Sequence, residues 1–129
     1  MPFMRMEHQS DPKQDLLDKL GDLEGLEVLH NQIVCAIYIR PDVTAGGIYL
    51  TDKYREEDKY QGKVGLVVKM GPDACKPDGQ WYQDVQINLH DWLAFRPSDG
   101  WPITINDVPC RVLEDPHVRM RISHPDMVW

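Results

Sequence analysis

The sequence predicts a mainly β protein, a small and partly open antiparallel β-barrel that carries a short N-terminal helix. Three observations lead to this fold class. Short apolar segments with strand periodicity recur from residue 27 onward, turn signals separate them, and a helical pattern precedes them. We therefore expect an N-terminal arm over residues 1–26 and a β domain over residues 27–129. The chain has 129 residues, of which 42% are hydrophobic, so it is long enough to bury one core.

The arm contains the pattern of one short amphipathic helix. Asp11 is a suitable N-cap, Pro12 suits the first helical position, and Gln14 stands where a capping box needs it. Three leucines follow on one helical face: Leu16, Leu17 and Leu20. A helix this short is marginal alone in water, so we expect these leucines to dock on the barrel, on a neighbouring copy or on a partner. The alternative is a frayed polar tail.

Strand patterns fill the rest of the chain. Residues 33–39 form a continuous apolar run, which is typical of a strand that is covered on both faces. Later segments are shorter or alternate between apolar and polar residues: 64–70, 85–89, 92–95, 103–105, 110–113 and 118–122. In the last of these, the inward residues are Val118, Met120 and Ile122, and Arg119 and Arg121 give the strand a cationic outer face. Turn signals lie between the strands at 77–79, 98–100 and 106–107.

Composition argues against several classes of protein. The net charge is −7, from 14 basic and 21 acidic residues. Binding to nucleic acid needs clustered Lys and Arg side chains, so this acidic composition argues against a nucleic-acid binder. No apolar run is long enough for a membrane span, and the N-terminus lacks the apolar segment of a signal peptide, so we expect a cytoplasmic protein. The three cysteines are too few for a disulfide framework, and we expect Cys35 and Cys110 to be buried.

Catalytic and metal-binding patterns do not occur in the sequence. None of the five histidines has the spacing of a zinc site, and the cysteines form no Cys-x-x-Cys pair. The chain also lacks a nucleophile elbow, a phosphate-binding loop and a dinucleotide fingerprint. We therefore expect no catalytic residue, no metal ligand and no cofactor, and we interpret the chain as a protein that is not an enzyme.

A long connection between two strong strands is the best candidate for a functional site. Residues 41–62 form a loop of a length that is uncommon in compact domains unless it has a function. Gly46 and Gly47 give this loop conformational freedom, and Ile48 and Leu50 are apolar residues that the barrel does not require. These two side chains are expected either to bind a partner or to pack beneath their own loop.

The order of these features resembles that of the GroES-like co-chaperonins, the chaperonin-10 family. The most specific features are Ala45-Gly46-Gly47-Ile48-Tyr49-Leu50 within the long loop and Gly62-Lys63-Val64 at the start of the next strand. The resemblance covers about residues 28–122. It implies a GroES-like barrel that assembles as a homo-oligomer, binds a chaperonin ring and closes its folding chamber, while the ring hydrolyses ATP. It also implies that Gly46, Gly47, Ile48, Tyr49 and Leu50 form the partner-binding segment and that residues 76–81 form a roof hairpin.

Four departures from the family pattern keep a second hypothesis open. They are the added arm, the bulky Tyr49, the charged and aromatic run at 52–60, and His90-Asp91 where the family usually has Gly-Asp. The same fold would also suit a capsid decoration (cement) protein that is bound to a shell of major capsid protein in a virion. A barrel that binds a small ligand in its mouth is a third, weaker alternative. The first two hypotheses share the expectation of a homo-oligomer or a bound array, because weak loop contacts need multiplicity.

Overall fold

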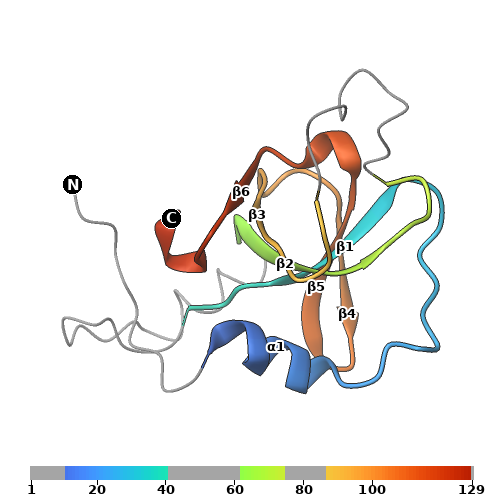
Figure 1. The fold of residues 1–129 in the computed structure, drawn as a ribbon, viewed down its shortest axis with the longest axis horizontal. Helices are drawn as coiled ribbons and strands as arrows, with labels where there is room; N and C mark the ends of the chain where they lie inside the picture. The colour runs from blue at the N-terminus through green and yellow to red at the C-terminus, as the bar shows by residue number, and fades with distance from the viewer. Residues whose placement is uncertain (1–10, 41–61, 75–86, 129) are drawn as a thin grey trace.

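One α-helix and six strands form the fold in the part of the chain that the computed structural model describes, residues 11–40, 62–74 and 87–128 (Figure 1). They are α1 (Pro12–Leu20), β1 (Gln32–Ile37), β2 (Val64–Met70), β3 (Trp92–Ala94), β4 (Trp101–Ile105), β5 (Val108–Glu114) and β6 (Met120–Ile122). Two 3-10 helices, η1 (Asp115–His117) and η2 (Pro125–Met127), flank β6 in the sequence. The mainly β fold class is confirmed.

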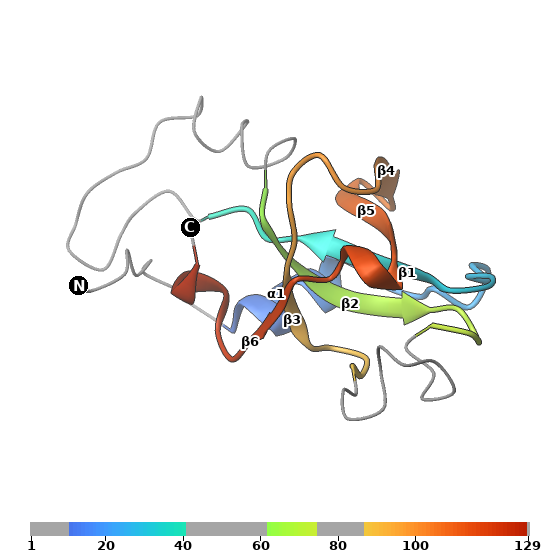
Figure 2. The same cartoon turned by 90° about the horizontal axis from the view of Figure 1, so that it is seen from above.

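The strands form one antiparallel sheet in the order β4-β5-β1-β2-β3-β6. Figure 2 shows β4 and β5 on one side of β1 and β2, with β3 and β6 on the other side. Within the described residues, β4 and β6 end this order and do not pair with each other. The barrel is therefore partly open, and β4 and β6 are its edge strands among the described strands.

Strand β1 is buried on both faces, as its continuous apolar run predicts. Val34, Ala36 and Tyr38 point into one hydrophobic cluster, which also contains Leu20 of α1 and which we call the helix-side cluster. The alternating residues Ile33, Cys35 and Ile37 point into a second, opposite cluster. Side chains must therefore pack against both faces of the sheet. Helix α1 of the arm supplies part of this packing on one face (Figure 1).

The start of α1 agrees with the sequence except in its capping box. Asp11 is the N-cap, its side chain accepts a hydrogen bond of 3.1 Å from the backbone N–H of Lys13, and Pro12 begins the helix. The side chain of Gln14 donates instead to Asp18 Oδ1, one turn further on, at 2.8 Å. The predicted capping-box role of Gln14 is therefore wrong, because this i,i+4 contact takes its amide away from the N-terminus. At the other end, Gly21 stops the helix with φ of 67°.

The predicted strand at 85–89 is wrong over its described residues, 87–89. Ile87 is buried, but Leu89 lies in a turn with 53% of its surface exposed. The chain turns there because the Asn88 N–H donates to the carboxylate of Asp91 at 2.9 Å, a local bond that competes with a strand ladder. The turn also contacts β2, since the His90 N–H donates to the Val67 carbonyl at 2.7 Å.

We expect His90→Gly to stabilise the folded protein by about 0.5 kcal/mol. The backbone of His90 has φ of 71°, a conformation that strains residues with a Cβ atom, and glycine removes this strain. The gain is small because glycine also makes the unfolded chain more flexible. Urea denaturation measures the change. The control Glu27→Gly, at an exposed residue without positive φ, should destabilise slightly, and equal effects of the two variants would contradict the interpretation.

The last strand, β6, is shorter and more exposed than its alternation predicts. Arg119 and Arg121 are exposed, so the cationic face is confirmed. Met120 was predicted to point inward, yet half of its surface is exposed. The reason is that β6 is an edge strand of three residues that pairs with β3 alone among the described strands, so nothing described covers its outer side.

Candidate docking site

The candidate loop is attached to the barrel at two neighbouring points. The β1–β2 ladder continues past Ile37 with a hydrogen bond of 2.9 Å from the Tyr38 N–H to the Val64 carbonyl. The chain between these residues therefore leaves and returns at the same end of the two strands. The predicted docking residues lie outside the described residues: Gly46, Gly47, Ile48, Tyr49 and Leu50.

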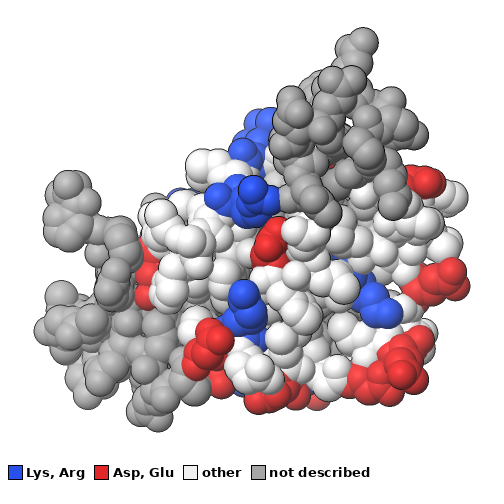
Figure 3. Space-filling model, viewed as in Figure 1, with Lys and Arg blue, Asp and Glu red and all other residues white. Residues whose placement is uncertain are grey.

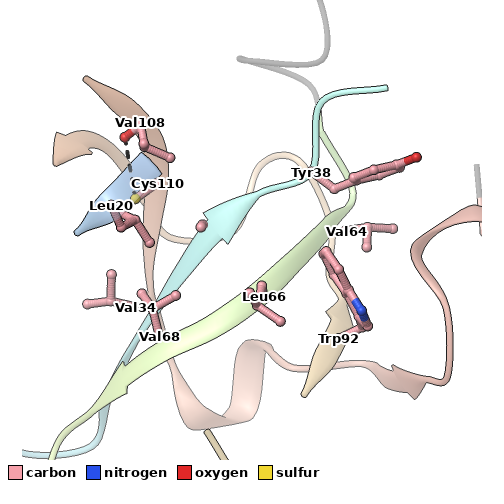
Figure 4. Close-up of a cluster of buried hydrophobic side chains, with 10 residues drawn as sticks. Leu20, Val34, Tyr38, Val64, Leu66, Val68, Trp92, Val108 and Cys110 are labelled. Atoms are coloured by element: carbon pink, nitrogen blue, oxygen red, sulfur yellow. Dashed lines mark hydrogen bonds between the residues drawn. The ribbon is translucent and has the colours of Figure 1, made fainter. Parts of the chain in front are cut away.

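Tyr38, at the base of this connection, makes contacts through its backbone, its hydroxyl and its ring. Its backbone bonds to Val64, and its hydroxyl donates to Oδ1 of the buried Asp126 at 2.6 Å. Its ring meets the Trp92 ring edge to face, with centroids 5.8 Å apart (Figure 4). These contacts hold Tyr38 against β2, Asp126 and Trp92. No local sequence pattern predicts the Tyr38–Asp126 bond, because 88 positions separate the two residues.

A glycine allows close packing beside this base. A Cβ atom at Gly65 would lie 2.8 Å from Cys35 Cβ and 3.1 Å from the Phe95 ring.

Cys35 is buried and free, and burial raises the pKa of its thiol well above its usual range. Burial also raises the pKa of Cys110 to about 11. Both thiols are therefore protonated at neutral pH, which makes them packing residues and poor nucleophiles.

The three leucines of the arm lie against their own subunit. Leu20 is 1% exposed and sits among barrel residues of the helix-side cluster, close to Val108 and Cys110 in Figure 4. Leu16 and Leu17 are partly buried and pack against the same cluster. Helix α1 contacts β5 in the sheet. The arm is thus part of the subunit's hydrophobic core from Leu16 onward.

A side chain from the β4–β5 turn completes the docking of α1. Asn106 and Asp107 both have positive φ, 49° and 65°, as the two central residues of a tight hairpin turn require. The Asn106 amide donates to the carbonyl oxygen of Leu20 at 2.6 Å, so it satisfies one of the free carbonyls at the helix C-terminus. Sequence patterns identified this pair only as a turn, because the bond joins residues 86 positions apart.

We expect Asn106→Gly to destabilise the protein by about 1 kcal/mol, the usual net contribution of one hydrogen bond. Glycine keeps the turn, since it tolerates positive φ, but it removes the bond to Leu20. Asp107→Gly is the matched control in the same turn and should change stability by less than half as much. Thermal unfolding measures both variants. Equal losses would mean that the turn conformation, and not the bond to α1, explains the effect.

A group of charged residues surrounds the turn between β3 and β4. Asp99 accepts two hydrogen bonds of 3.3 Å from Arg96, and these hold the pKa of its carboxyl below the usual range. The buried Arg111 donates to the backbone carbonyls of Pro97 and Asp99, which fixes the turn. Burial lowers the pKa of Arg111, and the nearby Asp99 carboxylate opposes that shift. Arg119 Nη2 lies 3.7 Å from Asp99 Oδ2, so one carboxylate serves two exposed arginines.

The described residues contain no group of three or more His, Cys, Asp or Glu side chains that could hold a metal ion. Among them, no helix has the length and apolar character that crossing a membrane requires. The described residues form an open sheet with a connection whose two ends are bonded to each other and with the arm packed against the helix-side cluster.

Comparison with known proteins agrees with this geometry. The family model described as "Chaperonin 10 Kd subunit" matches residues 25–119, which is well over half of the chain. A search of curated proteins finds no match. The family match supports a general co-chaperonin role, partnership with chaperonin rings and oligomerisation, and the family is generally non-enzymatic. This chain belongs to the chaperonin-10 family, the GroES-like co-chaperonins.

Proposed function

We propose that this chain is a co-chaperonin that binds a chaperonin ring through residues 46–50 and caps the ring as a homo-oligomer in the cytoplasm. The observation that carries this proposal is the attachment of the connection at its base, where Tyr38 bonds to Val64 and to Asp126. A firm attachment limits the volume that a binding segment searches, so less entropy is lost when it binds. Family membership supports the choice of a chaperonin ring as the partner.

The chemistry of the segment suits a weak contact that is repeated. Gly46 and Gly47 permit backbone conformations that other residues resist, and Ile48 and Leu50 offer apolar side chains to a groove. One such segment buries too little surface for stable binding alone. Several copies that bind together would raise the overall affinity through high effective concentration. No catalysis by this chain is part of the proposal, because the ring would hydrolyse ATP.

We expect the double variant Ile48→Ser and Leu50→Ser to weaken binding to a chaperonin ring by at least about tenfold, because every copy loses its apolar contact. The measurement is complex formation with purified ring in the presence of nucleotide. Leu89→Ser is the control, since Leu89 is an exposed apolar residue outside the connection. Its binding should match that of the unmodified protein.

Two results would contradict the proposal. Unchanged ring binding by the double variant would show that Ile48 and Leu50 do not form the contact. An equal loss from Leu89→Ser would show that binding depends on surface hydrophobicity in general. Circular dichroism of each variant establishes that the fold is retained.

A capsid decoration protein with the same fold is the second candidate. The charged and aromatic run at 52–60 favours it, because a loop of that composition suits a fixed contact on a large shell. The arm no longer favours it, since Leu20 is buried in its own subunit and does not need a shell to be covered. Detection of the chain in purified virions, together with failure to bind a chaperonin ring, would support this candidate over the first.

A further inference from the structure

The C-terminal segment turns back onto the barrel after β6. Strand β6 pairs with β3, and the short helix η2 follows it in the sequence. The family model matches residues 25–119, so η2 lies beyond the matched part of the chain. The family match therefore assigns no role to this segment, and its contacts in the structure are the guide to what it does.

Helix η2 is held in place by its own residues. The His124 side chain accepts a hydrogen bond of 3.1 Å at Nδ1 from the Asp126 N–H, and the Met127 N–H donates to the His124 carbonyl at 3.1 Å. Pro125 is buried, and Val128 packs against the helix-side cluster. The segment is thus anchored to the barrel on both sides of Asp126.

The side chains of η2 are arranged in the opposite way to those of most surface segments. The side chain of Asp126 is 1% exposed, whereas 46% of the surface of Met127 is exposed. In Figure 3, most of the surface in the place of η2 belongs to residues other than Asp, Glu, Lys and Arg, and Lys and Arg atoms lie beside it, over β6. A buried carboxylate costs free energy unless it is hydrogen-bonded, so the inward direction of Asp126 requires a partner in the barrel.

Tyr38 is such a partner. Its hydroxyl donates to Asp126 Oδ1 at 2.6 Å, a separation typical of an O–H donor bound to a carboxylate, and both residues are buried. Tyr38 follows the last residue of β1, and its own N–H donates to the Val64 carbonyl, so it lies where the connection leaves the sheet. Figure 4 shows its hydroxyl directed away from the other labelled side chains. The Tyr38–Asp126 bond therefore joins the C-terminal segment to the start of the connection.

We propose that residues 124–128 form a strap that fixes the point at which the connection leaves β1, and that Asp126 is a positioning residue that acts through Tyr38. With the strap in place, the Tyr38–Val64 bond stays closed, and the connection starts from one place. Without it, this end of the β1–β2 ladder opens more often, and more entropy is lost when residues 46–50 bind. The effect on binding rests on the proposed function, whereas the effect on the ladder does not.

Hydrogen exchange at single amides of the full chain tests the strap. Tyr38→Phe removes only the hydroxyl and keeps the ring that meets Trp92. The N–H of residue 38 should then exchange about tenfold faster relative to that of Gly71, which donates to Gln32 at the other end of the β1–β2 ladder. Asp126→Leu should have the same effect, and the two changes together should add little to either one, because both remove the same bond. Asp126→Asn keeps an acceptor oxygen and should have a smaller effect.

Binding to a purified chaperonin ring, measured where each variant is folded, tests the positioning. Tyr38→Phe and Asp126→Leu should each raise the dissociation constant by about threefold or more, since every copy loses the strap. Asn106→Gly is the matched control, because it also removes a hydrogen bond of 2.6 Å between distant residues, and it should change neither ring binding nor the exchange ratio. Thermal unfolding identifies any variant that fails to fold. Asp126→Leu and Asp126→Asn supply the comparison if Tyr38→Phe is such a variant.

Three results would overturn the inference. The first is an equal change at the amides of residues 38 and 71 in Tyr38→Phe, and the second is an equally large change of their ratio in Asn106→Gly. The third is normal ring binding by Tyr38→Phe when the double variant at residues 48 and 50 has lost it. If that double variant binds normally, the proposed function fails, and the exchange ratio alone decides whether residues 124–128 act as a strap.

Discussion

Gly71→Ala is expected to destabilise the folded protein by about 3 kcal/mol. A Cβ atom at residue 71 would lie 2.2 Å from the carbonyl oxygen of His30 and 2.7 Å from that of Leu29. Both are backbone atoms, so no side-chain rotation can relieve the overlap. The N–H of Gly71 also donates to the Gln32 carbonyl at 2.8 Å, which holds the two segments together. Urea denaturation at equilibrium measures the loss.

Gly25→Ala is the matched control for this variant. A Cβ atom at Gly25 would meet nothing within 4 Å, and the backbone there does not have positive φ. Alanine at this position should leave stability unchanged or raise it by about 0.5 kcal/mol, because it restricts the unfolded chain. A loss at Gly71 no greater than the change at Gly25 would show that β2 can move away from the segment before β1.

Leu20→Ala is expected to destabilise the protein by about 3 kcal/mol, within the range for buried leucines. Leu20 is 1% exposed, and its removal leaves a cavity among residues of the helix-side cluster. Leu16 and Leu17 are only partly buried and give α1 less support. Hydrogen exchange should therefore become faster in α1 before it does in β1. Thermal unfolding and exchange mass spectrometry measure the two effects.

Leu29→Ala provides the comparison for this prediction. Leu29 is 52% exposed, so alanine there should change stability by no more than about 0.5 kcal/mol. If both variants lose the same small amount, the arm contributes little to the stability of the subunit. In that case its leucines would be available to another molecule, contrary to the buried position of Leu20.

Features that local patterns determine were predicted well from the sequence. The continuous apolar run of β1 indicated a strand buried on both faces, and the structure shows both clusters. Asp11, Pro12 and Gly21 mark the ends of α1 as helix-capping chemistry predicts. Strand β2 ends at Met70, directly before Gly71-Pro72. Each of these signals acts over a few residues, so a sequence pattern contains it.

Features that join distant parts of the chain were not predicted. The bonds Asn106–Leu20 and Tyr38–Asp126 each span more than 80 positions, and no local pattern specifies such a pairing. The strand predicted at 87–89 is absent for a different reason. The hydrogen bond from the Asn88 N–H to the Asp91 carboxylate forms there in place of strand pairing. Met120 was misassigned because alternation gives the direction of a side chain but not whether a neighbouring strand covers it. The docking segment at 46–50 stays a prediction.

The hydrogen bond between Tyr38 and Val64 bears on how well the barrel would tolerate a different connection. Because the two residues are bonded to each other, a replacement sequence between them meets the barrel at the same two points. The entropy of closing such a connection grows slowly with its length, by about 0.6 kcal/mol for each doubling. A chimaera that carries a longer, shorter or unrelated insert should therefore still fold. Under the proposed function, exchanging the insert would change the partner while the barrel keeps its fold.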